Sequence, residues 1–454
     1  MLACACFDEV PSGNAEDATS LEPAPTTTSP DESSSAADEV GDSSSSGPPI
    51  LPGGVDESST GASGSVCGDG IVEDGESCDD ENQLAGDGCT LCQVSGTPQW
   101  IFTDGTDAPA EAASAVALAS PAGIVVVGAL ATDGADTDVW LEVLDDDGVS
   151  QLRRVVAGEG DGDDVAYDVR VRENGDISVV GEISTPVSFT DLWVGRYDGS
   201  GSLIDQSQAG STIGSDGARA VALLAGDQLA IAGRIGFAAA NDDAWLGRFV
   251  EGELSEAVSC DCGAQGHAAS IVADGDGRVR ATWQNGLAWQ LVGFDAPLSA
   301  ALPLPSWVVP LEGLLGPAFI DVGDDGGISL CGTVAAGNDD ALSLQTFSPD
   351  GAPQLGITYD VGDGDQRCTA ILTSGNVATM VGEIRGNLDD ARGLVVSVER
   401  TNGAVRYDSE LVIDDADETV INDIVIDSEG RTFVVGAFSS GGGDFDAFAA
   451  RLVP

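Results

Sequence analysis

Short stretches in which apolar and polar residues alternate run through the chain from residue 97 to residue 454. Alternation with a period of two is typical of a half-buried β-strand, because successive side chains point to opposite faces of a sheet. One group of four such stretches, separated by turn-forming residues, covers residues 165–171, 176–183, 192–197 and 202–209. Strong helical periodicity with capping residues is absent. The pattern predicts an all-β fold.

The group of four stretches recurs and carries two markers. The first marker is a small apolar stretch that ends in Gly, as at residues 124–128 and 177–181. The second marker is usually an Asp, any residue, and a large apolar residue. It occurs seven times at intervals near 50 residues and ends at Trp140, Trp193, Trp245, Trp289, Leu342, Arg392 and Phe448. In the fourth unit Trp283 replaces the Gly and only four residues lead to Leu287, so this unit has lost a loop and not a strand.

A period near 50 residues with four strands per unit is typical of a β-propeller. Seven units fill residues 97–454, and the last unit ends after its third strand. Residues 99–103 have the alternation of a strand and precede the first unit. We therefore predict a closed seven-bladed β-propeller whose last blade takes its fourth strand from residues 99–103, which removes an exposed edge. The period resembles that of kelch-type and related secreted bacterial propellers, without a diagnostic kelch motif.

Two segments of different composition precede the propeller. Residues 7–66 are rich in Ser, Thr, Pro, Gly, Asp and Glu and contain no basic residue, which predicts a disordered tether. Residues 67–92 form a cysteine-rich module with Cys67, Cys78, Cys89 and Cys92. So short a stretch cannot build an apolar core, and we expect disulfides to replace it. Four cysteines allow three disulfide pairings, and the sequence does not choose among them. The alternative is a zinc site formed by the same thiols, although many acidic residues lie beside them.

The module resembles the cysteine-rich repeat of myxobacterial surface proteins. The matching residues are Cys67-Gly68-Asp69-Gly70, Glu73, Gly75-Glu76, Cys78-Asp79-Asp80, Asn82 and Gly86-Asp87-Gly88-Cys89. Glu81 stands where the family usually has Gly, and the spacing from Cys89 to Cys92 is one residue shorter than usual. The resemblance implies a cell-surface setting and no activity.

The charge of the chain narrows the possible partners. All 17 basic residues are Arg against 77 acidic residues, and the net charge is −60. Nucleic acid and anionic membrane surfaces are therefore disfavoured, because both need clustered basic residues. No apolar run reaches 18 residues, so no transmembrane helix is predicted. Residues 1–6 contain Leu2-Ala3-Cys4, which resembles the end of a lipoprotein signal peptide with Cys4 as the lipid acceptor; the other interpretation is a chance Ala/Cys pair.

Calcium is the cofactor for which the acidic clusters offer candidate ligands. Within the module they are Asp79, Asp80, Asn82 and Asp87, whose oxygens suit calcium in a Gly-rich turn. Similar acidic clusters precede first strands at residues 161–164, 363–365 and 414–417. Neither of the first two continues as an EF-hand loop, and a solvated turn is the preferred interpretation of each cluster.

No catalytic residue is predicted. His267 is the only histidine, lacks a nucleophile elbow nearby, and is interpreted as structural at the start of a first strand. The repeated Trp residues could stack on sugars, but their regular position favours packing between blades. Cys331 and Cys368 lie in consecutive units and either bridge blades or remain buried thiols; Cys260 and Cys262 could form a loop disulfide.

These observations predict an exported, surface-displayed binding or scaffold protein, lipid-anchored and monomeric, which recognises a protein or a glycan through propeller loops. The alternative is a secreted hydrolase or lyase with its site in the central channel. Such an enzyme should place polar residues on its first strands, whereas stretches such as residues 115–118, 218–224 and 421–426 read as mostly small and apolar.

Overall fold

The computed structural model describes residues 8–9, 67–73, 76–105, 111–119, 122–131, 136–187, 189–210, 214–238, 241–250, 252–260, 266–295, 305–361, 364–386, 390–413, 416–440 and 444–454. Every regular element within these residues is a β-strand, so none of them belongs to a helix that could cross a membrane. The predicted tether and the predicted lipid site at Cys4 lie outside the described residues, apart from the two-residue strand β1 (Asp8–Glu9), which pairs with β16.

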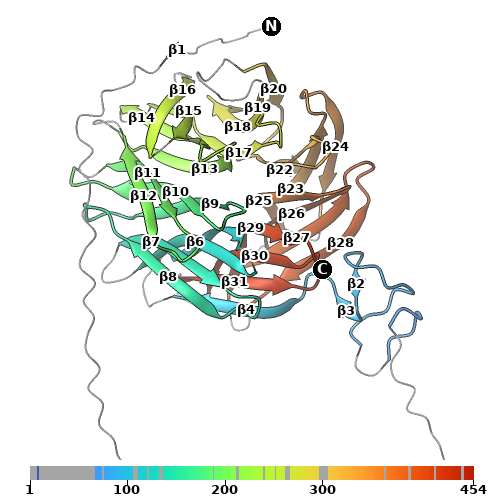
Figure 1. The fold of residues 1–454 in the computed structure, drawn as a ribbon. Helices are drawn as coiled ribbons and strands as arrows, with labels where there is room; N and C mark the ends of the chain where they lie inside the picture. The colour runs from blue at the N-terminus through green and yellow to red at the C-terminus, as the bar shows by residue number, and fades with distance from the viewer. Residues whose placement is uncertain are drawn as a thin grey trace, which may run out of the picture.

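The strands form a closed ring of seven antiparallel blades, as predicted (Figure 1). Each blade has four strands in chain order, the first nearest the ring axis and the fourth on the outside. The exceptions are that β4 is the fourth strand of the seventh blade and that β1 adds a fifth strand beside β16 in the third. Blade 1 has β5 (Ala112–Leu118), β6 (Ile124–Ala131), β7 (Thr137–Leu144) and β8 (Ser150–Val156). Blade 2 has β9 (Val165–Val171), β10 (Ile177–Ser184), β11 (Thr190–Tyr197) and β12 (Leu203–Ala209). Blade 3 has β13 (Gly217–Leu223), β14 (Leu229–Ala238), β15 (Asn241–Val250) and β16 (Glu253–Cys260).

Blade 4 has β17 (Ala268–Ala273), β18 (Val279–Asn285), β19 (Ala288–Phe294) and β20 (Trp307–Leu311). Blade 5 has β21 (Phe319–Val322), β22 (Ile328–Ala336), β23 (Asp339–Phe347) and β24 (Pro353–Tyr359). Blade 6 has β25 (Asp365–Ser374), β26 (Val377–Arg385), β27 (Ala391–Glu399) and β28 (Val405–Leu411). Blade 7 has β29 (Glu418–Ile426), β30 (Thr432–Ser439), β31 (Phe445–Leu452) and β4 (Pro98–Asp104).

The ring is closed by the strand from the N-terminal side, which confirms that prediction. β4 pairs antiparallel with β31, with Phe102 opposite Ala449 and Trp100 opposite Arg451. The indole of Trp100 lies 6.2 Å from the Phe433 ring, and its Nε1 donates to the Asp146 carbonyl of blade 1 at 2.9 Å. The closing strand therefore fixes the seam between blades 7 and 1 and leaves β31 without a free edge.

Seven separate apolar clusters hold the ring together, and each spans two neighbouring blades. Trp140, Trp193 and Trp245 are buried in three of these clusters, which confirms that they pack between blades. Each lies opposite the Gly of the first marker. That Gly is needed because the first strand bulges toward it: a Cβ on Gly128 would lie 1.9 Å from the Ala112 carbonyl oxygen.

Blade 4 departs from this arrangement, and Trp289 does not occupy the position that the second marker predicted. The β18–β19 hairpin has lost its loop as predicted, but the register then places Trp283 opposite Gln290, and Trp289 opposite Gln284. Trp289 therefore does not match Trp140, Trp193 and Trp245. It packs into the interface with blade 5. In blade 5 the residue opposite the marker glycine, Gly332, is Ser343 and not Leu342. In blade 6, Leu394 and not Arg392 lies opposite the marker glycine.

We define the upper face of the ring as the face that carries the connections between blades and the turns between second and third strands. The lower face carries the other turns, and several arginines there bind the neighbouring blade. Arg172 donates to the Leu224, Gly226 and Gln228 carbonyls, and Arg280 donates to the Pro349 carbonyl. These planar guanidinium groups therefore link adjacent blades through backbone carbonyls.

The cysteine-rich module lies against the end of the chain. Its described residues include the strand β2 (Cys89–Thr90), which pairs with β3 (Gln93–Val94) just after the module. Thr90 Oγ1 donates to the Pro454 carbonyl at 2.7 Å, and the Gly96 amide donates to the Val453 carbonyl at 2.8 Å. The module is thus tied to the two residues that follow β31.

Candidate functional site

The innermost strands carry more polar residues than the sequence pattern indicated. In six of the seven blades the first strand contains a bulge, which inserts one residue without a partner in the register. The inserted residues are Ser114, Tyr167, Arg219, Ala269, Thr369 and Asn422. A bulge redirects a side chain without disturbing the rest of the strand. Thr369 and Asn422 donate to carbonyls of the following blade, Ile421 and Ala113.

Three carboxylates bridge first strands around the ring axis. Asp168 accepts the Val221 amide, Asp321 the Thr373 amide and Asp423 the Val116 amide, at 2.8, 2.6 and 2.9 Å. These amides lie on the inner edges of first strands, where no further strand can accept their hydrogen bonds. The three carboxylates therefore join blades 2 to 3, 5 to 6 and 7 to 1. The expectation of apolar first strands was wrong for these blades.

Arg170 supplies the counter-charge for these three carboxylates. Its Nη1 lies 2.7 Å from Asp168 Oδ1. Burial acts to lower the pKa of Arg170, but Asp168, Asp423 and Asp321 together raise it. Burial, with the nearby Asp168, raises the pKa of Asp423 to about 7, although the Val116 amide and Arg170 oppose this. Burial also raises the pKa of Asp168 and Asp321. The ring axis thus holds an internal ion cluster.

A second polar group, the rim cluster, lies on blades 2 and 3 at the upper end of the ring and reaches blade 4. It consists of Tyr167, Glu182, Arg219, Arg234, Asp242 and His267. Tyr167 donates to Glu182 at 2.5 Å, and its ring lies 3.7 Å below the Arg219 guanidinium. Glu182 also contacts Arg234 at 3.1 Å and Arg219 at 3.6 Å. Burial, with Glu182, raises the pKa of Tyr167 despite Arg219, so this phenol stays protonated at neutral pH.

His267 precedes the first strand of blade 4, as the sequence predicted, and its imidazole meets Trp289 edge-on at 5.0 Å. Burial lowers the pKa of His267, and the charges of Arg219 and Arg234 lower it further against the effect of Asp242. The imidazole is therefore neutral at pH 7 and senses the charge of the rim cluster.

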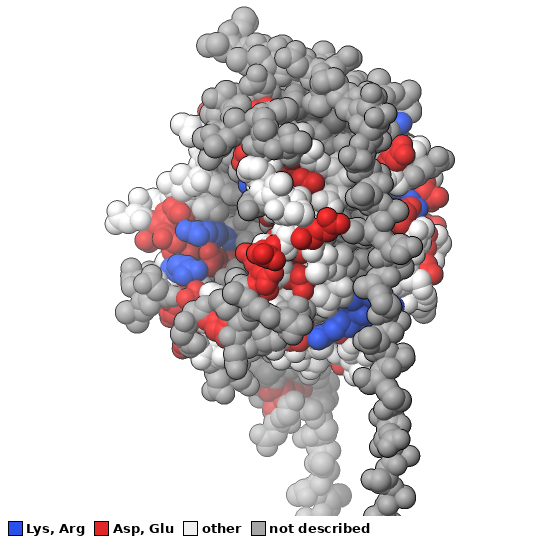
Figure 2. All heavy atoms as spheres, turned by 90° about the vertical axis from the view of Figure 1, so that its left-hand side faces the viewer, with Lys and Arg blue, Asp and Glu red and all other residues white. Residues whose placement is uncertain are grey.

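Two acidic residues before the first strand of blade 2 hold backbone amides of the fold. Asp164 accepts the Ser184 amide at 2.5 Å and also the Gly158 amide, and Asp163 accepts the Thr137 amide at 3.0 Å. A hollow of about 430 Å³ beside them is lined by Asp136, Asp161, Gly162 and Asp163. Asp363, Asp414 and Asp415 lie outside the described residues. On the face of the molecule that Figure 2 shows, acidic side chains are prominent, and most of the less numerous basic side chains lie beside them.

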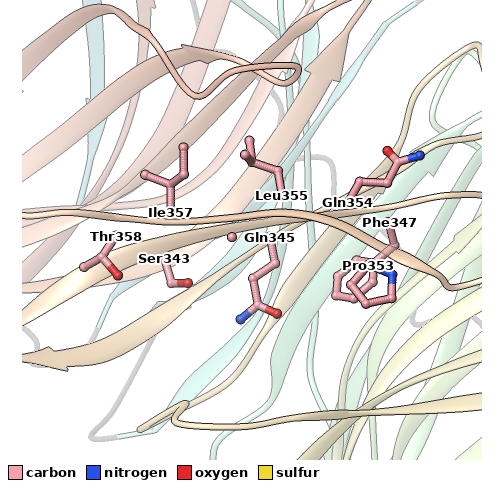
Figure 3. Close-up of a pocket in the computed structure, with 9 residues that line it drawn as sticks. Ser343, Gln345, Phe347, Pro353, Gln354, Leu355, Ile357 and Thr358 are labelled. Atoms are coloured by element: carbon pink, nitrogen blue, oxygen red, sulfur yellow. The ribbon is translucent and has the colours of Figure 1, made fainter.

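A hollow of about 310 Å³ opens at the outer strands of blade 5, β23 and β24. In Figure 3 the side chains of Ser343, Gln345 and Thr358 point to one side of the sheet, and those of Leu355 and Ile357 to the other. No titratable residue lines it. The hollow is lined by uncharged polar and apolar side chains.

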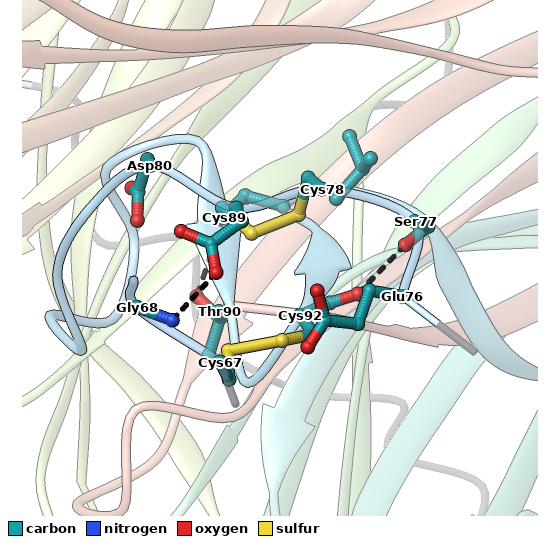
Figure 4. Close-up of a disulfide and its surroundings, with 12 residues drawn as sticks. Cys67, Gly68, Glu76, Ser77, Cys78, Asp80, Cys89, Thr90 and Cys92 are labelled. Carbon is teal, nitrogen blue, oxygen red and sulfur yellow. Dashed lines mark hydrogen bonds between the residues drawn. A yellow bond between two sulfur atoms is a disulfide. The ribbon is translucent and has the colours of Figure 1, made fainter. Parts of the chain in front are cut away.

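The module is held by two disulfides, Cys67–Cys92 and Cys78–Cys89 (Figure 4). All four predicted cysteines are thus oxidised, in one of the three possible pairings. A third disulfide, Cys331–Cys368, bridges blades 5 and 6. The side chains of Cys260 and Cys262 lie outside the described residues.

The module's calcium candidates are partly engaged by its backbone. Both oxygens of Asp79 accept amides, from Gly68 and Asp69 on one side and from Gly70 and Glu81 on the other. These contacts lower the pKa of Asp79, the Glu81 amide contributing most.

Asn82 Oδ1 accepts the Leu84 amide. Asp80 is half-buried, and Asp87 Oδ1 is buried without a hydrogen-bond partner in the described part of the chain. Among the described residues, Asp79, Asp80 and Asp87 do not together form a group of three His, Cys, Asp or Glu side chains whose ligand atoms lie within 4.8 Å of one another. Glu76, Asp79 and Cys92 do lie within 4.8 Å of one another, but Cys92 is bonded to Cys67.

Comparison with known proteins identifies the module only. A family model described as a domain of unknown function (DUF4215) matches residues 57–93. No curated protein matches the chain.

Three solved structures illustrate the similarity of the propeller to known folds. The polysaccharide lyase Uly1 is 12% identical, with a TM-score of 0.47 over 77% of this chain and 90% of that chain. Drosophila Plexin A in complex with Semaphorin 1b is 9% identical, with a TM-score of 0.45 over 78% and 87%. A protein of unknown function from Dyadobacter fermentans DSM 18053 is 12% identical, with a TM-score of 0.49 over 79% and 99%. Similarity at this level carries no information on ligand or reaction.

Proposed function

We propose that this chain is an exported binding protein that recognises a protein or glycan ligand on the upper face of its propeller. The observation that carries the proposal is the rim cluster. At the bulge position most other blades carry Ser, Ala, Thr or Asn, whereas blades 2 and 3 carry Tyr167 and Arg219. In a repeat protein, residues that depart from the repeat without a packing role indicate a binding surface.

Catalysis at the ring axis has less support. Asp168, Asp321 and Asp423 accept backbone amides, and Arg170 balances their charge. These groups act as links between blades, and a hydrolase would need carboxylates that are free to reach a substrate. The protonated Tyr167 is also a poor general base.

Several features support export and surface display. Three disulfides are typical of proteins from oxidising compartments. Leu2-Ala3-Cys4 supports a lipid anchor on Cys4, and the resemblance of the module to myxobacterial surface repeats supports the same location. The assignment of the propeller as kelch-like, which rests on its period and strand pattern, and calcium binding in the module are part of this proposal.

The test is a ligand capture with the whole chain. Surface-protein extracts and a glycan array are probed with the wild type, with Arg219→Gln plus Arg234→Gln, and with the lower-face variant Arg406→Gln. We expect the upper-face double variant to lose at least ten-fold in affinity and the lower-face variant to retain it. A ligand that binds all three proteins equally would place recognition elsewhere and overturn the proposal.

A further inference from the structure

The two arginines of the rim cluster have unused hydrogen-bond donors. Arg219 stacks on Tyr167, and its contact with Glu182 is 3.6 Å, longer than a hydrogen bond. The Nε of Arg234 is buried and has no hydrogen-bond partner among the described residues. A guanidinium group has five N–H donors, and buried donors are normally satisfied. Arg234 also lies 3.6 Å from Asp242, so the two arginines face two carboxylates, but Arg234 Nε and the donors of Arg219 are left without a hydrogen bond to them.

A buried Nε without a partner among the described residues also occurs at Arg392, Arg400 and Arg451, but other arginines of the ring are fully engaged. Arg172 on the lower face donates to three carbonyls of the next blade. In blade 6, Arg385 donates to both Glu383 and Glu418, at 3.1 and 3.2 Å. Glu383 occupies the position after the marker glycine that Glu182 occupies in blade 2. In this related cluster of blade 6, Arg385 is thus satisfied within the protein, whereas Arg367 lies 3.6 Å from Glu383, as Arg219 does from Glu182.

We propose that Arg219 and Arg234, beside His267, bind a carboxylate group of the ligand. This inference rests on the proposed binding function and names the chemistry of its ligand. A planar carboxylate accepts two parallel hydrogen bonds from a guanidinium group. Stacking on Tyr167 holds the Arg219 fork in one orientation, which lowers the entropy cost of binding. A ligand with one isolated carboxylate suits the site, because the net charge of −60 repels polyanions.

The single histidine provides the test. An untagged full chain has one imidazole, so one C2–H proton resonance reports on His267. The chain is titrated with acetate and, separately, with the neutral isostere acetamide at constant ionic strength. We expect acetate to shift the resonance in a saturable way and to raise the pKa of His267, because a nearby negative charge favours the imidazolium. Acetamide should cause neither change.

Two variants complete the test: one removes an arginine of the proposed site, and the other is the control. Arg219→Gln should abolish the saturable shift, and Arg367→Gln, which alters the related cluster in blade 6, should leave it intact. Equal melting temperatures of the variants establish that both are folded. A linear response to acetate, an equal response to acetamide, or a saturable shift that survives Arg219→Gln would overturn the inference. If ligand capture is still lost in the upper-face double variant, the proposed function stands and only the carboxylate chemistry fails.

Discussion

The cysteine-rich module and the propeller are stabilised by different forces. Seven apolar clusters between blades carry the ring. Two disulfides and the amides gathered around Asp79 carry the module, in which Ile71, Val72, Leu84 and Leu91 are exposed. A segment too short to bury apolar surface relies on covalent links, whereas a repeat buries its surface against the next copy. The two regions should therefore respond to different perturbations.

Removal of the closing strand should have the largest effect, and only on the ring. Deletion of residues 97–104 takes away β4 and its Trp100 contacts with Phe433 and Asp146. We expect the melting temperature to fall by about 10 °C or more, because an apolar edge of β31 becomes free. Deletion of residues 1–96 keeps β4 and serves as the control. Equal melting temperatures in calorimetry would contradict the closure.

Loss of one interface aromatic should come next. Trp140 is fully buried in the cluster between blades 7 and 1. Trp140→Ala should lower the free energy of unfolding of the ring by about 3–5 kcal/mol, the range for large-to-small changes in a core. Leu287→Ala is the control, because Leu287 is 98% exposed. Urea unfolding followed by tryptophan fluorescence measures both, and similar losses would show that the interface is not the source of stability.

The sequence predicted the ring well because inter-blade packing leaves a periodic trace. The alternation and the marker glycines follow from packing contacts that the blades repeat. The absence of a fourth strand from the last unit indicates where the ring closes. Trp289 packs between blades as predicted, but its position in the blade was predicted wrongly, because the shortened hairpin of blade 4 changes the register by one residue. Tyr167 and Arg219 were missed as a site because a bulge adds one residue without interrupting an apolar strand. The asymmetric parts of a repeat are thus the least predictable and the most informative about function.

The ion cluster at the axis should make the ring pH-dependent and leave the module unaffected. The pKa of Asp423 is raised to about 7 by burial, so the folded state binds its proton more tightly than the unfolded state. Its contribution to stability is complete below pH 4 and is lost as the pH rises to 7, by roughly 1.4 kcal/mol per unit of pKa difference. The raised pKa values of Asp168 and Asp321 act in the same direction.

Asp423→Asn tests this, because an amide oxygen can still accept the Val116 amide and carries no charge. Between pH 4 and 8, chemical unfolding should show a smaller decline in stability for this variant than for the wild type. Glu429→Gln, at a side chain that is 72% exposed, should follow the wild type. Parallel curves for Asp423→Asn and the wild type would show that Asp423 does not titrate in this range.

The smallest and most local effect should come from the module. Cys78→Ser with Cys89→Ser removes the disulfide that closes a separation of 11 residues, which is worth about 3 kcal/mol in the chain-entropy account. The loss should stay local, because the module joins the ring through a few backbone contacts at Thr90 and Gly96. A protease that cuts after acidic residues should then cleave within residues 67–92, a stretch without Lys or Arg, while the melting temperature of the ring is unchanged. A lower melting temperature would mean that the module supports the blade 7 seam, and the two regions would then form one cooperative unit.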